Sequence, residues 1–165
     1  MNVLMLAAGL GARLRTVTLK YPKTCVPFLN VPLGLYGFRF LEHLRFADLT
    51  VNTFHLPDKT TSLYESQPYY KKVISFSHET GKIPGSAGGL KKASRQFQNK
   101  NQDTILMMNS DEILFDVDPE FLNHAYEQHL KEKNLATLVV MKHPEAGKKF
   151  GAIWCEQNRV VHQSC

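Results

Sequence analysis

Apolar residues occur in short runs that alternate with longer stretches of helical spacing. Runs bounded by polar or glycine-containing turns predict buried strands at residues 3–6, 49–54, 73–76, 104–108, 135–141 and 151–155. Apolar residues recurring every three or four positions predict helices at residues 35–46, 58–66 and 86–97, and a further one that begins near Pro119 and carries Phe121, Leu122, Ala125 and Leu130. Ser86 is the expected N-cap of the third helix. Strands that alternate with helices imply an α/β fold with a mostly parallel sheet and right-handed crossovers.

The first predicted strand leads into a glycine-containing turn that reads L-A-A-G-L-G-A-R from Leu6 to Arg13. Gly9 and Gly11 leave no side chain between the backbone and a ligand. Exposed N–H groups in such a turn can face a polyphosphate. Arg13 and Lys23 add the positive charge that a triphosphate needs. The turn and its two cations therefore predict a triphosphate-binding loop.

Two other glycine motifs are excluded. A dinucleotide-binding fingerprint needs a third glycine where this chain has Leu14, and a later carboxylate that residues 28–35 do not contain. A P-loop needs Gly-Lys followed by Ser or Thr. The Gly-Lys pairs of this chain are followed instead by Ile83 and Lys149.

The predicted order of elements brings distant residues to one edge of the sheet. Ligands of open parallel sheets gather at the carboxyl ends of the strands. The glycine turn, the loop after residues 73–76 and Asp111 all fall at that edge. An acidic residue directly after a buried strand suits Mg²⁺, so Asp111 is the candidate metal ligand.

Composition sets the broad class of the protein. The 165 residues are 43% hydrophobic and 21% charged, as in a globular domain with a sizeable core. Three cysteines without metal-ligand spacing favour a reducing cytoplasm. The N-terminus lacks the basic region of a signal peptide, and no apolar run is long enough to span a membrane. We therefore expect a cytoplasmic protein with no membrane partner.

The chain carries a formal net charge of +5, which suits anionic partners. Its basic residues come as scattered doublets such as Lys71-Lys72 and Lys91-Lys92, with no basic run or stripe interleaved with aromatic residues. A nucleic-acid-binding domain is therefore the weakest hypothesis. The same positive charge would suit anionic substrates such as nucleotides and sugar phosphates equally well.

The residues around the turn resemble the signature of the sugar-phosphate nucleotidyltransferase family. That signature runs L-A-A-G-x-G-x-R-L-x-P-x-T, then P-K and a further proline. The matching residues are Leu6, Ala7, Ala8, Gly9, Gly11, Arg13, Leu14, Thr18, Pro22, Lys23 and Pro27. Thr16 departs from the pattern, because the family usually has proline there, but the change removes no charged group.

Further matches follow in the family's order. Residues 51–57 are similar to the V-N-x-x-H-L-P stretch of members that act on mannose-1-phosphate or N-acetylmuramate-1-phosphate. Residues 77–79 and 85–91 are similar to its S-x-E and G-T-A-G-G-L-K, and residues 109–111 stand in place of its N-G-D. Phe150-Gly151 is similar to its Y-G. The resemblance implies a three-layer, Rossmann-like nucleotidyltransferase fold with a mostly parallel sheet.

The resemblance also implies an activity. A sugar-1-phosphate would attack the α-phosphorus of a nucleoside triphosphate, with GTP or UTP favoured, and yield a nucleotide sugar and pyrophosphate. The implied catalytic residues are Arg13 on the β- and γ-phosphates, Lys23 on the α-phosphate, and Asp111 on Mg²⁺. The implied nucleotide-binding residues are Leu6, Ala7, Ala8, Gly9, Gly11, Arg13, Lys23, Glu79, Gly85, Ser86 and Gly88, with Glu79 the candidate for the base edge. Asn109 and Gly151 are the implied contacts of the sugar phosphate.

Members of the family usually continue to an E-K-P element that holds the sugar and to a second metal-binding aspartate. Neither follows Arg159-Val160-Val161 here. We therefore expect residues 1–165 to be a nucleotidyltransferase domain that lacks the C-terminal part of the sugar-binding half. Such a chain would bind the triphosphate with Mg²⁺ but turn over sugar-1-phosphate poorly or not at all. The alternative is a catalytically incomplete nucleotide-binding module that acts as a regulator or subunit; the sequence leaves the oligomeric state open.

Overall fold

The computed structural model describes residues 1–99 and 101–164. The chain forms two compact units, residues 1–124 and residues 125 onward. The third cysteine, Cys165, lies outside the described residues. Each unit is described by itself below.

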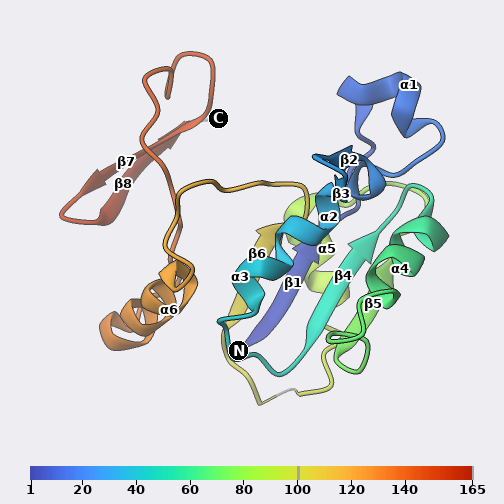
Figure 1. Ribbon diagram of the computed structural model, residues 1–165. Helices are drawn as coiled ribbons and strands as arrows, with labels where there is room; N and C mark the ends of the chain where they lie inside the picture. Colours follow the sequence, from blue (N-terminus) through green and yellow to red (C-terminus); the bar gives the residue numbers. More distant parts are fainter. Residues whose placement is uncertain (100, 165) are drawn as a thin grey trace. The chain divides into compact units, whose positions relative to one another are not determined.

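The described part of the first unit is built on a four-stranded sheet with the order β5-β4-β1-β6 (Figure 1). Its strands are β1 (Asn2–Leu6), β4 (Leu49–Thr53), β5 (Ile74–His78) and β6 (Ile105–Asn109). Every neighbouring pair is parallel. This confirms the predicted α/β fold. It also confirms four of the predicted strands, whose ends differ from the predicted ends by no more than two residues.

Helices cover both faces of this sheet. Leu4 of β1 packs against Ala93 and Phe97, at and just beyond the end of α5 (Gly85–Ala93). The next residue, Met5, points to the opposite face because side chains alternate along a strand. There its methyl group lies 2.9 Å from the position of an added Cβ on Gly37, between α2 (Leu33–Tyr36) and α3 (Phe38–Leu41). The sheet is thus the middle of three layers.

Aromatic rings fill the layer formed by α3 and α4 (Pro57–Glu65). The Phe38 ring meets Tyr64 edge-on at 5.4 Å between centroids and stacks on Tyr70 at 4.3 Å. Burial raises the pKa of Tyr70 to about 12, and its hydroxyl donates to the carbonyl of Phe38 at 3.2 Å. The cluster fixes α4 beside the sheet, which matters for the site below.

Two predictions about helices are wrong in detail. The helix expected at residues 35–46 divides into α2 and α3 at Gly37, a residue that destabilises a helix interior and here lies against Met5. Ser86 is not an N-cap: α5 begins one residue earlier, at Gly85, after Pro84, and no side chain caps it. Gly85 turns the chain with a φ of 73°, so Ser86 already lies inside the helix. No described helix is long and apolar enough to cross a membrane.

The second unit contains an antiparallel hairpin of β7 (Ala152–Glu156) and β8 (Arg159–Ser164). Helix α6 (Phe121–Glu132) begins in the first unit and ends in the second. The strand predicted at residues 135–141 is wrong, because these residues form no regular structure and their apolar side chains are exposed. A strand needs a neighbour for its backbone N–H and C=O groups. None of the described strands pairs with this segment.

Leu4→Ala should lower the free energy of unfolding by about 2–5 kcal/mol, since it removes a fully buried side chain from the contact between β1 and α5. Urea unfolding followed by circular dichroism measures this change. Leu19→Ala is the matched control, because Leu19 is 74% exposed and should alter stability by less than about 0.5 kcal/mol. A loss at Leu4 no larger than at Leu19 would contradict the assigned core.

Candidate active site

The carboxyl ends of the parallel strands lie in one row. Leu6 of β1 is in register with Asn52 of β4 on one side and with Asn109 of β6 on the other. Thr53 is in register with His78 of β5, which places Glu79 at the same edge. A cavity of about 650 Å³ opens along this row. Its lining consists of Leu6, Ala7, Ala8, Gly9, Gly11, Ala12, Arg13, Leu14, Lys23, Thr24, Asn52, Glu79, Ile83, Gly85, Ser86, Asn109, Ser110, Asp111 and Glu112.

The glycine turn after β1 is held in a left-handed backbone conformation. Gly11 has a φ of 62° and precedes a short 3₁₀ helix, η1 (Ala12–Leu14), that carries Arg13. A Cβ added to Gly11 would lie 2.7 Å from Cγ2 of Thr18. The Thr18 hydroxyl reaches the carbonyl oxygens of Gly11 at 3.1 Å and of Leu14 at 3.2 Å. Both backbone and packing therefore require glycine here.

His55 supports the same turn from the loop after β4. Its Nε2 lies 2.6 Å from the carbonyl oxygen of Thr18, the last residue of α1 (Arg15–Thr18). His55 belongs to the stretch 51–57, which sequence analysis singled out only by resemblance. In the structure it links the loop between β4 and α4 to the segment behind Arg13.

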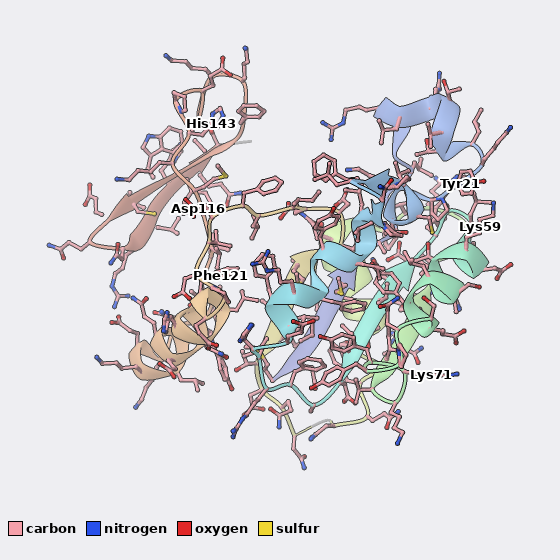
Figure 2. All side chains as sticks on the ribbon, in the orientation of Figure 1. Tyr21, Lys59, Lys71, Asp116, Phe121 and His143 are labelled. Carbon is pink, nitrogen blue, oxygen red and sulfur yellow. The ribbon has the colours of Figure 1, made fainter. Side chains whose placement is uncertain are left out.

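Helix α4 positions Lys23. The ammonium of Lys59 lies 4.5 Å from the centroid of the Tyr21 ring and donates to the carbonyl of Lys20 at 2.6 Å (Figure 2). The Cys25 thiol lies 3.5 Å from the carbonyl oxygen of Lys59. Burial raises the pKa of that thiol, which keeps it protonated as a donor. These contacts fix both ends of the segment that carries Lys23.

Two of the predicted catalytic side chains meet directly. The Lys23 ammonium forms an ion pair with the Asp111 carboxylate, and both side chains are partly exposed. Ser110, just before Asp111, is buried and donates to the carbonyl oxygen of Leu6 through its hydroxyl at 2.7 Å and its N–H at 3.1 Å. Ser110 thus joins the ends of β6 and β1 and sets the position of Asp111.

A buried polar relay crosses the floor of the cavity. The N–H of Ala7 donates to Oδ1 of Asn52 at 2.7 Å, and Nδ2 of Asn52 donates to Oε1 of Glu79 at 2.8 Å. Asn52 and Glu79 are only 3% and 5% exposed. Gly89 of α5 makes room for them, since an added Cβ would lie 2.9 Å from both Asn52 Nδ2 and Glu79 Oε1. The relay connects the turn after β1 to the loop after β5.

The structure brings most of the sequence-predicted site residues together in this cavity, and two are not among its lining. Gly88 faces Pro84 instead, because its added Cβ would lie 2.5 Å from the Pro84 Cβ. Gly151 belongs to the second compact unit. Sequence reasoning missed the roles of Asn52 and Ser110. A polar residue within the buried strand 49–54 was the available signal for Asn52.

The side chains near Asp111 determine what kind of metal ion this part of the cavity could bind. Among the described residues, no group of three or more His, Cys, Asp or Glu side chains could hold a metal by itself. The neighbouring Glu112 uses its Oε1 to accept from Nδ2 of Asn109 at 2.5 Å. Mg²⁺ is commonly held by one or two carboxylates together with substrate phosphates and water. The Asp111 carboxylate fits that kind of site, because Glu112 accepts from Asn109 and Glu79 accepts from Asn52.

Comparisons with known proteins point to one family. Residues 2–163 match the model of the family described as nucleotidyl transferase. The chain is 30% identical over 167 residues to a UTP–glucose-1-phosphate uridylyltransferase of Synechocystis sp., with 96% of this chain covered. It is 35% identical over 156 residues to a mannose-1-phosphate guanyltransferase of Aspergillus oryzae, with 93% covered. It spans only 42% and 40% of these two relatives.

Solved structures show the same fold. A putative glucose-1-phosphate thymidylyltransferase from Bacillus anthracis superposes with a TM-score of 0.70 at 21% identity, over 99% of this chain and 63% of that one. The inositol-1-phosphate CTP transferase from T. maritima superposes with a TM-score of 0.72 at 18% identity, over 98% of this chain and 62% of that one. These superpositions establish the Rossmann-like nucleotidyltransferase fold.

Proposed function

Since the chain belongs to the nucleotidyl transferase family, we propose that it transfers a nucleoside monophosphate from a nucleoside triphosphate to a sugar-1-phosphate. The products are a nucleotide sugar and pyrophosphate. The proposed nucleotide is GTP or UTP, and the proposed cofactor is Mg²⁺. The sparse cysteines, typical of a reducing compartment, support a cytoplasmic location.

One observation carries the proposal: a single cavity gathers Arg13, Lys23 and Asp111 with the backbone of the glycine turn. The N-terminus of α5 adds N–H groups that no side chain caps, and Gly85 and Ser86 line the cavity there. Free N–H groups and two cations suit a triphosphate, which is long and strongly anionic. The residues that line the cavity are therefore suited to binding a nucleoside triphosphate.

The proposed step forms one bond and breaks another. An oxygen of the sugar-1-phosphate attacks the α-phosphorus, and the bond from the α-phosphorus to the bridging oxygen of pyrophosphate breaks. Such transfer depends on alignment and on neutralising negative charge. Arg13 would hold the β- and γ-phosphates, and Lys23 would draw the α-phosphate and the incoming phosphate together. Asn109 is the cavity residue proposed for the sugar phosphate, whereas Gly151 stays a prediction from resemblance.

Asp111 would hold the metal ion. The chemistry that Mg²⁺ would supply when Asp111 holds it is neutralisation of the negative charge on the phosphates. The Lys23–Asp111 ion pair would then open, which leaves the Lys23 ammonium for phosphate. Ser110 would keep the carboxylate at the end of β6 during this exchange.

Pyrophosphate release tests the proposal. The purified chain would be incubated with Mg²⁺, GTP or UTP, and mannose-1-phosphate or N-acetylmuramate-1-phosphate. Release that requires both substrates, with a nucleotide sugar as co-product, supports the proposal. Triphosphate binding without release would show that residues 1–165 act alone only as a nucleotide-binding module, and no triphosphate binding would overturn both hypotheses.

Arg13→Ala should weaken triphosphate binding by roughly ten- to a hundredfold, because charge-assisted hydrogen bonds contribute about 1.5–3 kcal/mol. Isothermal titration calorimetry with GTP and UTP in the presence of Mg²⁺ measures the loss. Arg15→Ala is the matched control: Arg15 is two residues away on α1 and is not among the cavity lining. Equal losses in the two variants would show that only general surface charge matters.

A further inference from the structure

One tyrosine hydroxyl is buried without a hydrogen-bond partner. Tyr64 of α4 is 0% exposed, and its hydroxyl oxygen meets no donor or acceptor among the described residues. Leaving such a group unpaired is costly, because it has given up its hydrogen bonds to water. The ring itself is well packed, since Phe38 meets it edge-on. A phenylalanine would pack in the same way, so packing alone does not account for the hydroxyl.

The Tyr64 hydroxyl lies beside the segment that carries Lys23. A Cβ added to Gly34 would lie 2.7 Å from the hydroxyl oxygen and 3.0 Å from Cβ of Thr24, the residue that follows Lys23. Gly34 has no positive φ that would itself require glycine. Its missing side chain instead makes room for the hydroxyl next to Thr24.

The same hydroxyl is a neighbour of Ser110. Burial raises the pKa of Tyr64 and keeps the phenol protonated; the nearby Ser110 hydroxyl acts in the opposite direction, and the charge of Asp111 acts together with burial. Ser110 uses its hydroxyl hydrogen on the carbonyl oxygen of Leu6 at 2.7 Å, so its lone pairs can still accept a hydrogen bond. Tyr64 has a hydrogen without an acceptor. A small movement of Ser110 would therefore satisfy both groups.

We propose that Tyr64 is a positioning residue for Asp111 and acts through Ser110. This inference rests on the proposed function and deepens it. In the structure Asp111 is paired with Lys23, and the Tyr64 hydroxyl is unpaired. When Asp111 turns from Lys23 toward a metal ion, the Tyr64 hydroxyl donates to Oγ of Ser110. A bond that forms in only one of two arrangements shifts the equilibrium toward it, so Tyr64 favours the arrangement in which Asp111 holds the metal ion.

Tyr64→Phe tests the inference by two measurements. The variant should be at least as stable in urea as the wild-type chain, because the metal-free protein loses only an unpaired hydroxyl. Calorimetric titration with GTP or UTP, in Mg²⁺ and in EDTA, gives the factor by which Mg²⁺ strengthens triphosphate binding. That factor should fall by about three- to tenfold in Tyr64→Phe, the effect of one hydrogen bond, and the affinity in EDTA should be unchanged.

Tyr70→Phe is the matched control. The Tyr70 hydroxyl is also buried against Phe38, but it already donates to the carbonyl of Phe38. This variant should therefore be less stable than the wild-type chain and should keep the full Mg²⁺ factor. A Tyr64→Phe protein that keeps the full factor, or that is less stable than the wild-type chain, would overturn the inference and leave the proposed function intact. A wild-type chain whose triphosphate affinity does not respond to Mg²⁺ would overturn the proposed metal site and this inference with it.

A double-mutant cycle tests the route through Ser110. Ser110→Ala removes the proposed acceptor, so adding Tyr64→Phe to it should reduce the Mg²⁺ factor no further. Additive losses in the double variant would show that Tyr64 does not act through Ser110. If Ser110→Ala does not fold, the comparison of Tyr64→Phe with Tyr70→Phe decides.

Discussion

Asp111→Asn should make triphosphate binding nearly independent of Mg²⁺. In the wild-type chain Mg²⁺ should strengthen binding by at least about tenfold, because the ion can join the carboxylate to the phosphates. Asparagine keeps the shape of the side chain and loses its charge, so this gain should disappear. Without metal the variant should bind the triphosphate more tightly than wild type does. The reason is that Lys23 is freed from its ion pair and a negative charge leaves the cavity.

Calorimetric titrations of GTP or UTP in Mg²⁺ and in EDTA measure both effects. Glu112→Gln is the control: Glu112 lies beside Asp111 in the cavity, and its Oε1 already accepts from Asn109. The control should keep most of the Mg²⁺ enhancement. If Asp111→Asn retains it as well, Asp111 does not bind the metal ion.

The sheet and the location of the site could be predicted because both follow from local patterns and one rule of topology. A strand buried on both faces reads as a continuous apolar run, as at residues 3–6. Once the strands of the sheet are parallel, their carboxyl ends must share an edge. This rule places Arg13, Glu79 and Asp111 in one region, and all three line the same cavity.

Contacts between side chains of different strands could not be predicted in this way. The relay from Ala7 through Asn52 to Glu79 depends on the register of β1, β4 and β5, which apolar patterning does not specify to one residue. Asn52 was therefore missed, although its strand was predicted. The ion pair of Lys23 with Asp111 likewise joins residues far apart in the chain.

The errors have local causes of their own. Residues 135–141 are as apolar as the true strands, but a strand forms only where a neighbour can pair with it. Gly88 belongs to a motif whose glycines looked equivalent in the sequence. In the structure Gly85 turns the chain, Gly89 makes room for the relay, and Gly88 contacts Pro84.

Gly11→Ala should have the largest effect of any single methyl group added to the cavity. An alanine at a φ of 62° costs about 1–2 kcal/mol, and its Cβ would lie 2.7 Å from Thr18. Relieving that overlap costs roughly 1–3 kcal/mol more. Either the turn moves or Thr18 leaves the carbonyl oxygens of Gly11 and Leu14. If the turn relaxes in the free protein, the part of this cost that binding must restore is lost from triphosphate affinity, up to roughly a thousandfold at about 1.4 kcal/mol per factor of ten; strain that does not relax lowers stability instead.

Gly9→Ala separates this geometric cause from the mere loss of a glycine. Gly9 lies in the same turn and lines the same cavity, but an added Cβ there has no described atom within 4 Å and its φ is not positive. The Gly9→Ala variant should be as stable in urea as the wild-type chain, whereas the Gly11→Ala variant should be less stable. Any loss of triphosphate affinity in Gly9→Ala then reports contact of the new methyl group with the ligand. If Gly11→Ala keeps wild-type stability and affinity, the left-handed turn does not set the position of Arg13.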